Sequence, residues 1–333
     1  MTSKDHRSAG YRSATAGGLI ALLLWSTTFA LARSASEQVG SFTAAAAIYG
    51  VSAAAACISL LFVPTKLQQM LRLPRLYLGV CGLLFVLYMI ALYIAIGLAH
   101  DRTQTLVVAL LNYLWPALTI LLSLPLLRVK ATLLLLPATV LAIAGVALVL
   151  MQGHDLSWHA LAVSSLANPA AYLLATFAAI AWALYSNLTR RWAGGSGPGA
   201  AELFLSATAL AMLLLSLTSH EPRGWTIRAV AEVTAMGLAN WTAYRLWDTA
   251  MRRGNMSLVA AASYGTPLLS TVVSCLYLGV TAGGSLWVGC LLLIAGSVLS
   301  WVSIRVPVRV QCSPEKETHD PAHQPVANPR CRK

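Results

Sequence analysis

Two short polar runs interrupt long apolar segments of the chain, and each run ends in proline. The first, from Asn112 to Pro116, brings an amide, a phenol and an indole together inside the apolar segment 106–127. The second, from Ser263 to Pro267, again has a tyrosine three residues before its proline. Lipid offers no hydrogen bonds, so polar side chains in an apolar helix normally face other helices or a water-filled cavity. We therefore predict that both runs line an interior pathway, with Pro116 and Pro267 as hinges.

Aromatic side chains elsewhere in the apolar segments add surfaces on which a flat ring can stack. The alternative is that each aromatic anchors its helix at the lipid interface, and that each small hydroxyl bonds its own backbone. The recurrence of the polar run in both halves of the chain favours a substrate cavity. The predicted cavity residues are Trp25, Tyr88, Asn112, Tyr113, Trp115, Trp182, Tyr185, Trp241, Tyr244, Ser263 and Tyr264.

One predicted helix carries charge on the same face as two aromatic rings. That face holds Trp241, Tyr244, Arg245 and Asp248, which follow one another at helical spacing. Charge at a helix centre costs roughly 2.5–3.5 kcal/mol on insertion scales, so charged residues there usually pair or line water. Two interpretations remain open. Arg245 and Asp248 form an ion pair near the cytoplasmic boundary, or they contact a substrate or act as a gate.

The chain has no sequence pattern typical of an active site. It has no glycine-rich phosphate loop, no metal-ligand cluster and no catalytic arrangement suited to hydrolysis inside a membrane. Its six cysteines fit no disulfide framework or zinc motif. We therefore expect no metal, no cofactor and no enzymatic activity.

The elements that must position these residues are membrane-spanning helices. Hydrophobic residues make up 58% of the 333 residues and charged residues only 10%. Apolar runs long enough to cross a bilayer follow one another almost to the end. The sequence thus predicts an all-α membrane protein with ten transmembrane helices. Their predicted ranges are 14–33, 41–62, 76–98, 104–127, 131–150, 168–189, 201–219, 229–251, 256–279 and 284–304.

Basic residues indicate the orientation. When alternate loops are assigned to the cytoplasm, most of the 23 lysine and arginine residues fall there, as the positive-inside rule requires. Both termini are therefore predicted to be cytoplasmic, with 1–13 as the N-terminal segment and 305–333 as a disordered tail. The formal net charge of +12 follows from the same bias, so we expect membrane lipid as a partner and no nucleic acid.

The two halves of the chain repeat each other. One constant offset aligns Tyr113 with Tyr264 and Pro116 with Pro267, and towards the amino end Trp25 matches Trp182. The repeats are predicted as 14–150 and 168–304, with five helices each and an external loop at 151–167. An odd number of crossings inverts the second repeat relative to the first, which is typical of alternating-access transporters.

At these residues the chain resembles the EamA-type carriers of the drug/metabolite transporter superfamily. The resemblance covers about residues 14–304 and rests on the runs 24–27, 112–116, 254–255 and 263–267. It implies a multi-pass inner-membrane exporter of aromatic and other bulky neutral amino acids, working without a cofactor. An EamA-type carrier of another small metabolite or drug, and a non-transporting membrane receptor or sensor, remain as alternatives. We expect a monomer, with an oligomer left open.

Overall fold

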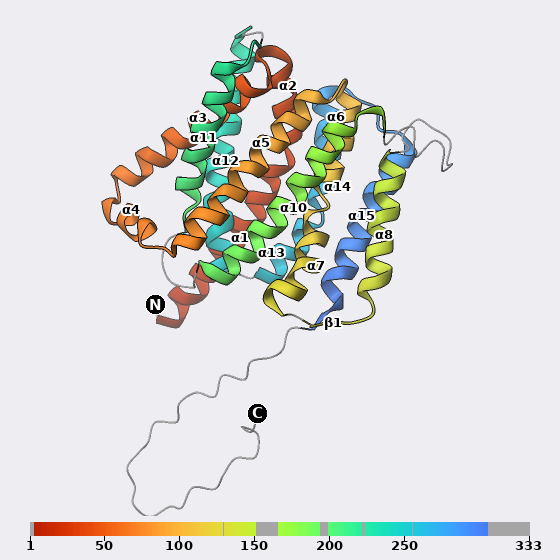
Figure 1. The fold of residues 1–333 in the computed structure, drawn as a ribbon. Helices are drawn as coiled ribbons and strands as arrows, with labels where there is room; N and C mark the ends of the chain where they lie inside the picture. Colours follow the sequence, from red (N-terminus) through yellow and green to blue (C-terminus); the bar gives the residue numbers. More distant parts are fainter. Residues whose placement is uncertain are drawn as a thin grey trace, which may run out of the picture.

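The computed structural model describes residues 3–128, 130–150, 166–193, 199–221, 224–254 and 256–305. They form a bundle of helices (Figure 1). Strands in these residues are limited to an antiparallel pair, β1 (Lys130–Ala131) and β2 (Ile304–Arg305). The predicted all-α class is confirmed. The predicted tail beyond Arg305 and the predicted loop up to residue 165 lie outside the described residues.

The first half of the chain contains long helices, shorter ones and one π-helical turn, η1. Its described helices are α1 (Ser3–Ser26), α2 (Thr28–Val39), α3 (Ser41–Leu61), α4 (Pro64–Leu71), η1 (Tyr77–Cys81), α5 (Gly82–Leu98), α6 (Arg102–Asn112), α7 (Trp115–Leu127) and α8 (Leu135–Leu150).

The second half follows a similar order. Its described helices are α10 (Pro169–Trp192), α11 (Ala201–Thr218), α12 (Ile227–Arg253), α13 (Met256–Ser263), α14 (Thr266–Leu278) and α15 (Gly284–Ser303).

Seven described segments are long and apolar enough to cross a membrane. They are Gly10–Val39, Ser41–Leu61, Tyr77–Leu98, Arg102–Leu127, Pro169–Trp192, Ala201–Thr218 and Gly284–Ser303. Shorter apolar helices cover Leu135–Val149 and Thr266–Leu278. This composition is that of a protein whose helices cross a membrane several times.

Both polar runs break their helices, so each of the predicted ranges 104–127 and 256–279 holds two helices. Proline lies in the first turn of α7 and of α14, where its missing N–H is tolerated. The chain turns just before each of these helices. Leu114 N donates to Leu111 O at 3.1 Å, and Gly265 N donates to Ala262 O at 3.0 Å. Because a proline cannot bond the carbonyl four residues back, the helix resets at this point.

The predicted range 14–33 for the first helix is wrong at both ends. Helix starts at Ser3, breaks at Thr27, and continues as α2 to Val39. It passes residue 33 because α2 packs on α12, where Ser34 Oγ donates to Glu232 Oε1 at 2.8 Å. Gly40 then ends the helix at a φ of 89°, which glycine adopts without strain.

The helices pack as pairs around a common centre, with α1 against α12, α3 against α11, and α10 against α5 and α7. The α8 and α15 pair lies on one side of the bundle (Figure 1). There, a Cβ added at Gly145 would come within 2.7 Å of the Gly289 carbonyl oxygen. Glycine therefore lets these two backbones touch.

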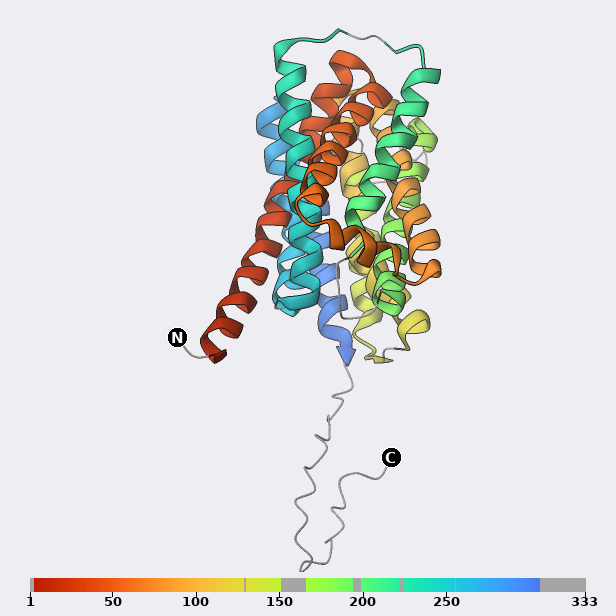
Figure 2. The same ribbon diagram turned by 90° about the vertical axis from the view of Figure 1, so that its left-hand side faces the viewer.

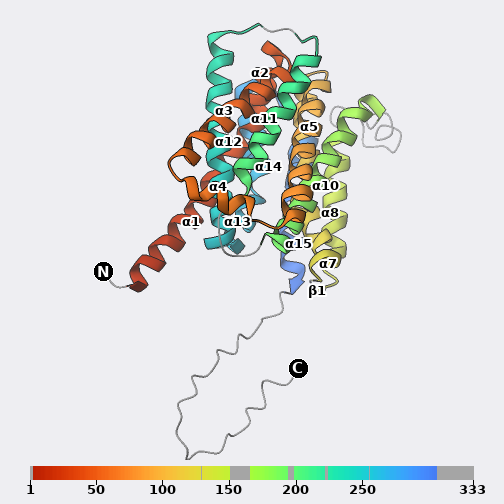
Figure 3. The ribbon, with the colours of Figure 1, turned by 60° about the vertical axis from the view of Figure 1, so that its left-hand side comes forward.

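The bundle has two distinct ends in Figure 1, which we call the upper and lower ends. The upper end holds the carboxyl end of α2, and the lower end holds α13, the start of α1 and strand β2 (Figures 1 and 2). Helix α4 projects from the side of the bundle near the lower end (Figures 1 and 3).

Candidate functional site

A small cavity lies at the centre of the bundle, beside the breaks in α6/α7 and α13/α14. Its volume is about 50 Å³, which is room for a few water molecules. Every polar run, aromatic helix face and helix break discussed above contributes to it or borders it. It is lined by Leu22, Trp25, Thr28, Phe29, Tyr49, Tyr88, Met89, Leu92, Asn112, Tyr113, Trp115, Trp182, Asn240, Tyr244 and Thr266.

The structure brings most of the predicted cavity residues together. The predicted residues that line the cavity are Trp25, Tyr88, Asn112, Tyr113, Trp115, Trp182 and Tyr244. The predicted hinges, Pro116 and Pro267, are buried at the helix breaks beside it.

Four predicted residues lie outside the cavity lining. The Tyr185 ring packs behind Trp182, with ring centroids 5.1 Å apart. Ser263 and Tyr264 are buried at the break between α13 and α14. Trp241 instead packs beneath the guanidinium group of Arg245, whose Cζ lies 4.7 Å from the ring centroid.

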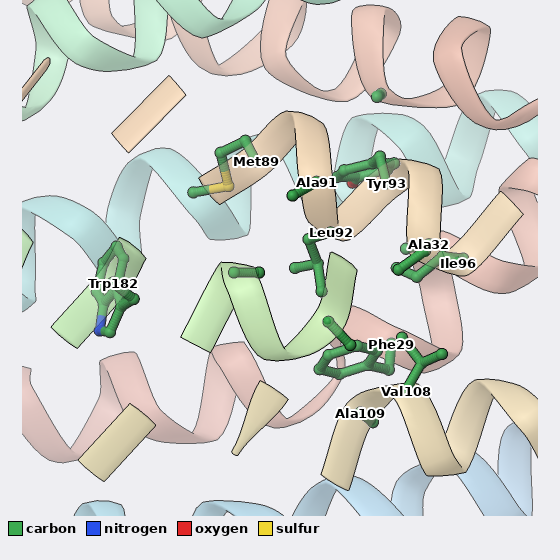
Figure 4. Packing of buried hydrophobic residues seen from close by; sticks show 14 of the residues in the cluster. Phe29, Ala32, Met89, Ala91, Leu92, Tyr93, Ile96, Val108, Ala109 and Trp182 are labelled. Atoms are coloured by element: carbon green, nitrogen blue, oxygen red, sulfur yellow. The ribbon is translucent and has the colours of Figure 1, made fainter. Parts of the chain in front are cut away.

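Trp182 is the centre of the aromatic wall. Its ring lies 5.0 Å from Tyr88, 6.0 Å from Tyr244 and 6.1 Å from Trp25, measured between centroids. Trp115 follows at 6.4 Å. Because α10 carries Trp182 into contact with rings from four other helices, the cavity offers several edge and face surfaces to a flat apolar group. Figure 4 shows Trp182, Met89 and Phe29 among the buried hydrophobic side chains of the core.

Polar atoms are few in this wall, and three of them have no partner. Trp25 Nε1, Asn112 Oδ1 and Thr266 Oγ1 are buried and form no hydrogen bond within the described part of the chain. Asn112 and Asn240, which are 2% and 4% exposed, add two carboxamides. A buried donor without a partner destabilises the fold by about 1–3 kcal/mol. Such groups can bind the polar end of a small molecule that enters the cavity.

The sequence analysis missed four lining residues that contribute an amide, an aromatic ring or a thioether: Phe29, Tyr49, Met89 and Asn240. The Tyr49 hydroxyl lies 2.8 Å from Met89 Sδ, so the two residues fill one part of the wall together. Asn240 could have been found, because it precedes Tyr244 by one helical turn on α12. Nothing in the local pattern of α3 distinguishes Tyr49 from an interfacial tyrosine.

Arg245 lies near the lower end and pairs with a carboxylate from another helix. Its Nε is 3.7 Å from Oε1 of Glu202 on α11, which also pairs with Lys66 from α4. Asp248 packs closely against Gly199, where a Cβ would collide with its carboxylate. Glu202 is thus an acidic partner of Arg245, and it was not among the predicted site residues.

Three carboxylates connect the helices at the upper end. Glu37 binds Arg33 and Arg102, while Glu232 accepts from Ser34 and from Arg228 Nε. The third carboxylate belongs to Glu221, which lies at the amino end of α3. It accepts from the backbone N–H groups of residues 42 and 43 at 2.9 and 2.8 Å, where a helix dipole favours negative charge.

Broken helices beside an aromatic cavity, inside a bundle with several helices long and apolar enough to cross a membrane, are those of a multi-pass membrane protein. The chain matches the EamA-like transporter family over residues 13–151 and again over residues 169–302. The protein belongs to this family. It is therefore a multi-pass inner-membrane transporter and not an enzyme.

Curated relatives cover almost the same length. The chain is 33% identical over 294 residues to the aromatic amino acid exporter YddG of Salmonella typhimurium and 32% identical over 294 residues to that of Escherichia coli K12. It is 30% identical over 299 residues to YddG of Ancylobacter novellus. Each match covers 88% of this chain and 98% of the relative.

A solved crystal structure shares the fold. It is 26% identical in sequence and superposes with a TM-score of 0.61, covering 87% of this chain and 96% of that chain. The arrangement of helices described above is therefore also that of an experimentally solved protein.

Proposed function

We propose that this protein exports aromatic amino acids from the cytoplasm by alternating access through the central cavity. The observation that carries the proposal is the wall of aromatic rings around Trp182, which suits a flat side chain. The relatives named as aromatic amino acid exporters support the same substrate class. The unpaired Trp25 Nε1 and Thr266 Oγ1 would face the amino or carboxylate end of the substrate.

The small size of the cavity supports a conformational cycle. Sites for small molecules usually have about 300–1,000 Å³, whereas this cavity has about 50 Å³. Binding therefore requires the helices to separate. Movement at the breaks beside Pro116 and Pro267 would widen the cavity without unfolding a continuous helix.

The proposal includes ten membrane crossings in two inverted five-helix repeats, 14–150 and 168–304, with both termini in the cytoplasm. Two observations support this topology. The family match falls into two segments of similar length, and the start of α1 lies at the same end of the bundle as β2 (Figures 1 and 2). The lower end would then face the cytoplasm and the upper end the periplasm.

The test is counterflow of labelled amino acids in proteoliposomes. We expect uptake of tryptophan and phenylalanine and little uptake of glycine. Trp115→Ala should reduce aromatic counterflow roughly fivefold or more, because it removes a stacking surface of about 1 kcal/mol or more. Trp301→Ala is the matched control, since Trp301 is exposed on α15. Equal counterflow of aromatic and small substrates would contradict the proposed specificity.

A further inference from the structure

A second hollow lies on the side of the bundle, between α4, the η1–α5 segment and α11. It is a groove of about 480 Å³, which is within the usual range of about 300–1,000 Å³ for a small-molecule site. Its lining is entirely apolar and includes Leu71, Leu78, Gly82, Phe204 and Ala207. The groove therefore fits a hydrocarbon chain better than a polar ligand.

The apolar side chains next to the groove face outward. Leu61 and Phe62, just before α4, are 79% and 82% exposed, and Leu71 at the end of α4 is 61% exposed. Since α4 projects from the bundle near its lower end (Figures 1 and 3), these residues suit a helix lying at the membrane interface. The groove thus opens towards lipid rather than towards the central cavity.

Positive charge lies in the turn that joins two groove residues. Arg72 and Arg75 fall between Leu71 and Leu78, and both are exposed. Neither forms an ion pair in the described part of the chain, whereas Lys66 on the same segment pairs with Glu202. Two free guanidinium groups beside an apolar groove match the phosphate and the acyl chain of one lipid molecule.

We propose that this groove binds an anionic phospholipid, with an acyl chain against Phe204 and the phosphate at Arg72 and Arg75. On the proposed topology the lipid comes from the cytoplasmic leaflet. Phe204 links the groove to the cavity: its ring lies 5.8 Å from Phe85, and Phe85 lies 6.1 Å from Trp182. The bound chain would therefore support the outer side of the aromatic wall.

Native mass spectrometry of the purified protein tests the proposal, with phosphatidylglycerol and phosphatidylcholine as the added lipids. We expect the protein to retain phosphatidylglycerol at roughly tenfold lower concentration than phosphatidylcholine. Retention of both lipids at the same concentration would overturn the proposal. So would a stable dimer that binds no lipid, because a second copy would then occupy the groove. Lipid retention does not depend on transport, so this result is independent of the proposed export function.

Two variants locate the site. Arg72→Gln combined with Arg75→Gln should abolish the preference for phosphatidylglycerol, while Arg190→Gln, another exposed arginine, should preserve it. Ala207→Phe should fill the groove and weaken retention, and Leu210→Phe on the same helix, at a position 59% exposed, should not. Size-exclusion profiles establish that each variant is folded. Unchanged retention in both the double arginine variant and Ala207→Phe would place the lipid elsewhere and refute the site.

Discussion

At the upper end of the bundle, hydrogen-bonded carboxylates join helix ends that are far apart in sequence, whereas towards the lower end contacts between aromatic rings also join helices. Glu232 accepts from Ser34, Gln38, Arg228 and Tyr277. Towards the lower end, the Trp247 ring lies 5.1 Å from Trp25 and 6.5 Å from Trp115.

The two kinds of contact respond differently to movement. Separating helices joined by a hydrogen-bond network requires several directional bonds to break at once. Packed rings can slide past each other before they separate, because dispersion attraction is not directional. Glu202 is the counterpart of Glu232 near the lower end, but it binds two cationic side chains, Lys66 and Arg245, whereas four side chains donate to Glu232. We therefore expect the described conformation to open more readily at its lower end.

The largest effect is expected for Glu232→Ala. Ser34 and Gln38 would lose a buried acceptor, and each unsatisfied buried group costs about 1–3 kcal/mol. We expect a total loss of roughly 2–4 kcal/mol in unfolding free energy. Thermal unfolding of the detergent-purified protein would show a midpoint several degrees lower. The control is Glu232→Gln, which keeps the shape of the side chain and one acceptor oxygen, so its unfolding midpoint should lie between those of Glu232→Ala and the wild type. An unchanged midpoint for Glu232→Ala would show that the network adds no stability.

Glu202→Ala should have a smaller effect. Its partly exposed partners, Lys66 and Arg245, can turn to water when the carboxylate is removed, so we expect a loss of about 1–2 kcal/mol. Measuring the unfolding free energy of Arg245→Ala and of the double variant Arg245→Ala/Glu202→Ala completes a double-mutant cycle. At 3.7 Å the coupling energy should be below about 1 kcal/mol. A loss equal to that of Glu232→Ala would remove the distinction between the two ends.

The sequence was enough to predict the elements that carry the cavity. Asn112, Trp115 and Pro116 stand out because polar and helix-breaking residues are unusual inside an apolar run. The structure places two of these, Asn112 and Trp115, in the cavity wall and Pro116 at a helix break. The local sequence was sufficient here, because lipid cannot satisfy the hydrogen bonds of polar groups in any spanning helix.

The networks at the two ends could not be predicted in the same way. Glu232 bonds Ser34, and Glu202 pairs with Lys66, across more than a hundred residues of chain. No period or motif links such residues, and each looks like a single charge on its own helix. Helix α4 was missed for another reason: its eight residues are too short for a spanning pattern.

Changes at the helix breaks should slow transport with little effect on stability. Pro116→Ala restores a backbone donor at the start of α7 and allows a continuous helix, so we expect a severalfold lower counterflow rate and a stability change within about 1 kcal/mol. Pro125→Ala is the control, because Pro125 lies inside the same helix but away from the break. Equal rates for Pro116→Ala and the wild type would remove the hinge from the proposed mechanism.

The smallest change in stability is expected for Arg102→Lys at the upper end. Arg102 donates to Glu37 through Nε and Nη2 and to Leu278 O through Nη1, so it joins α6 to α2 and α14. Lysine keeps the charge but cannot make these contacts together. Because the Arg102 side chain is 45% exposed, solvent screening should limit the loss to below about 1 kcal/mol.

Opening of the upper end should nevertheless increase, and cavity labelling measures it. In a variant whose native cysteines are replaced, Thr28→Cys places a thiol in the cavity wall, where a membrane-impermeant maleimide added outside cells can reach it only through the upper end. Arg102→Lys should raise the labelling rate severalfold. Arg245→Lys, near the lower end, should leave it unchanged, because the upper network remains intact. If both variants raise labelling equally, or neither does, then Arg102 does not hold the upper end closed and the two ends do not differ in the way their contacts indicate.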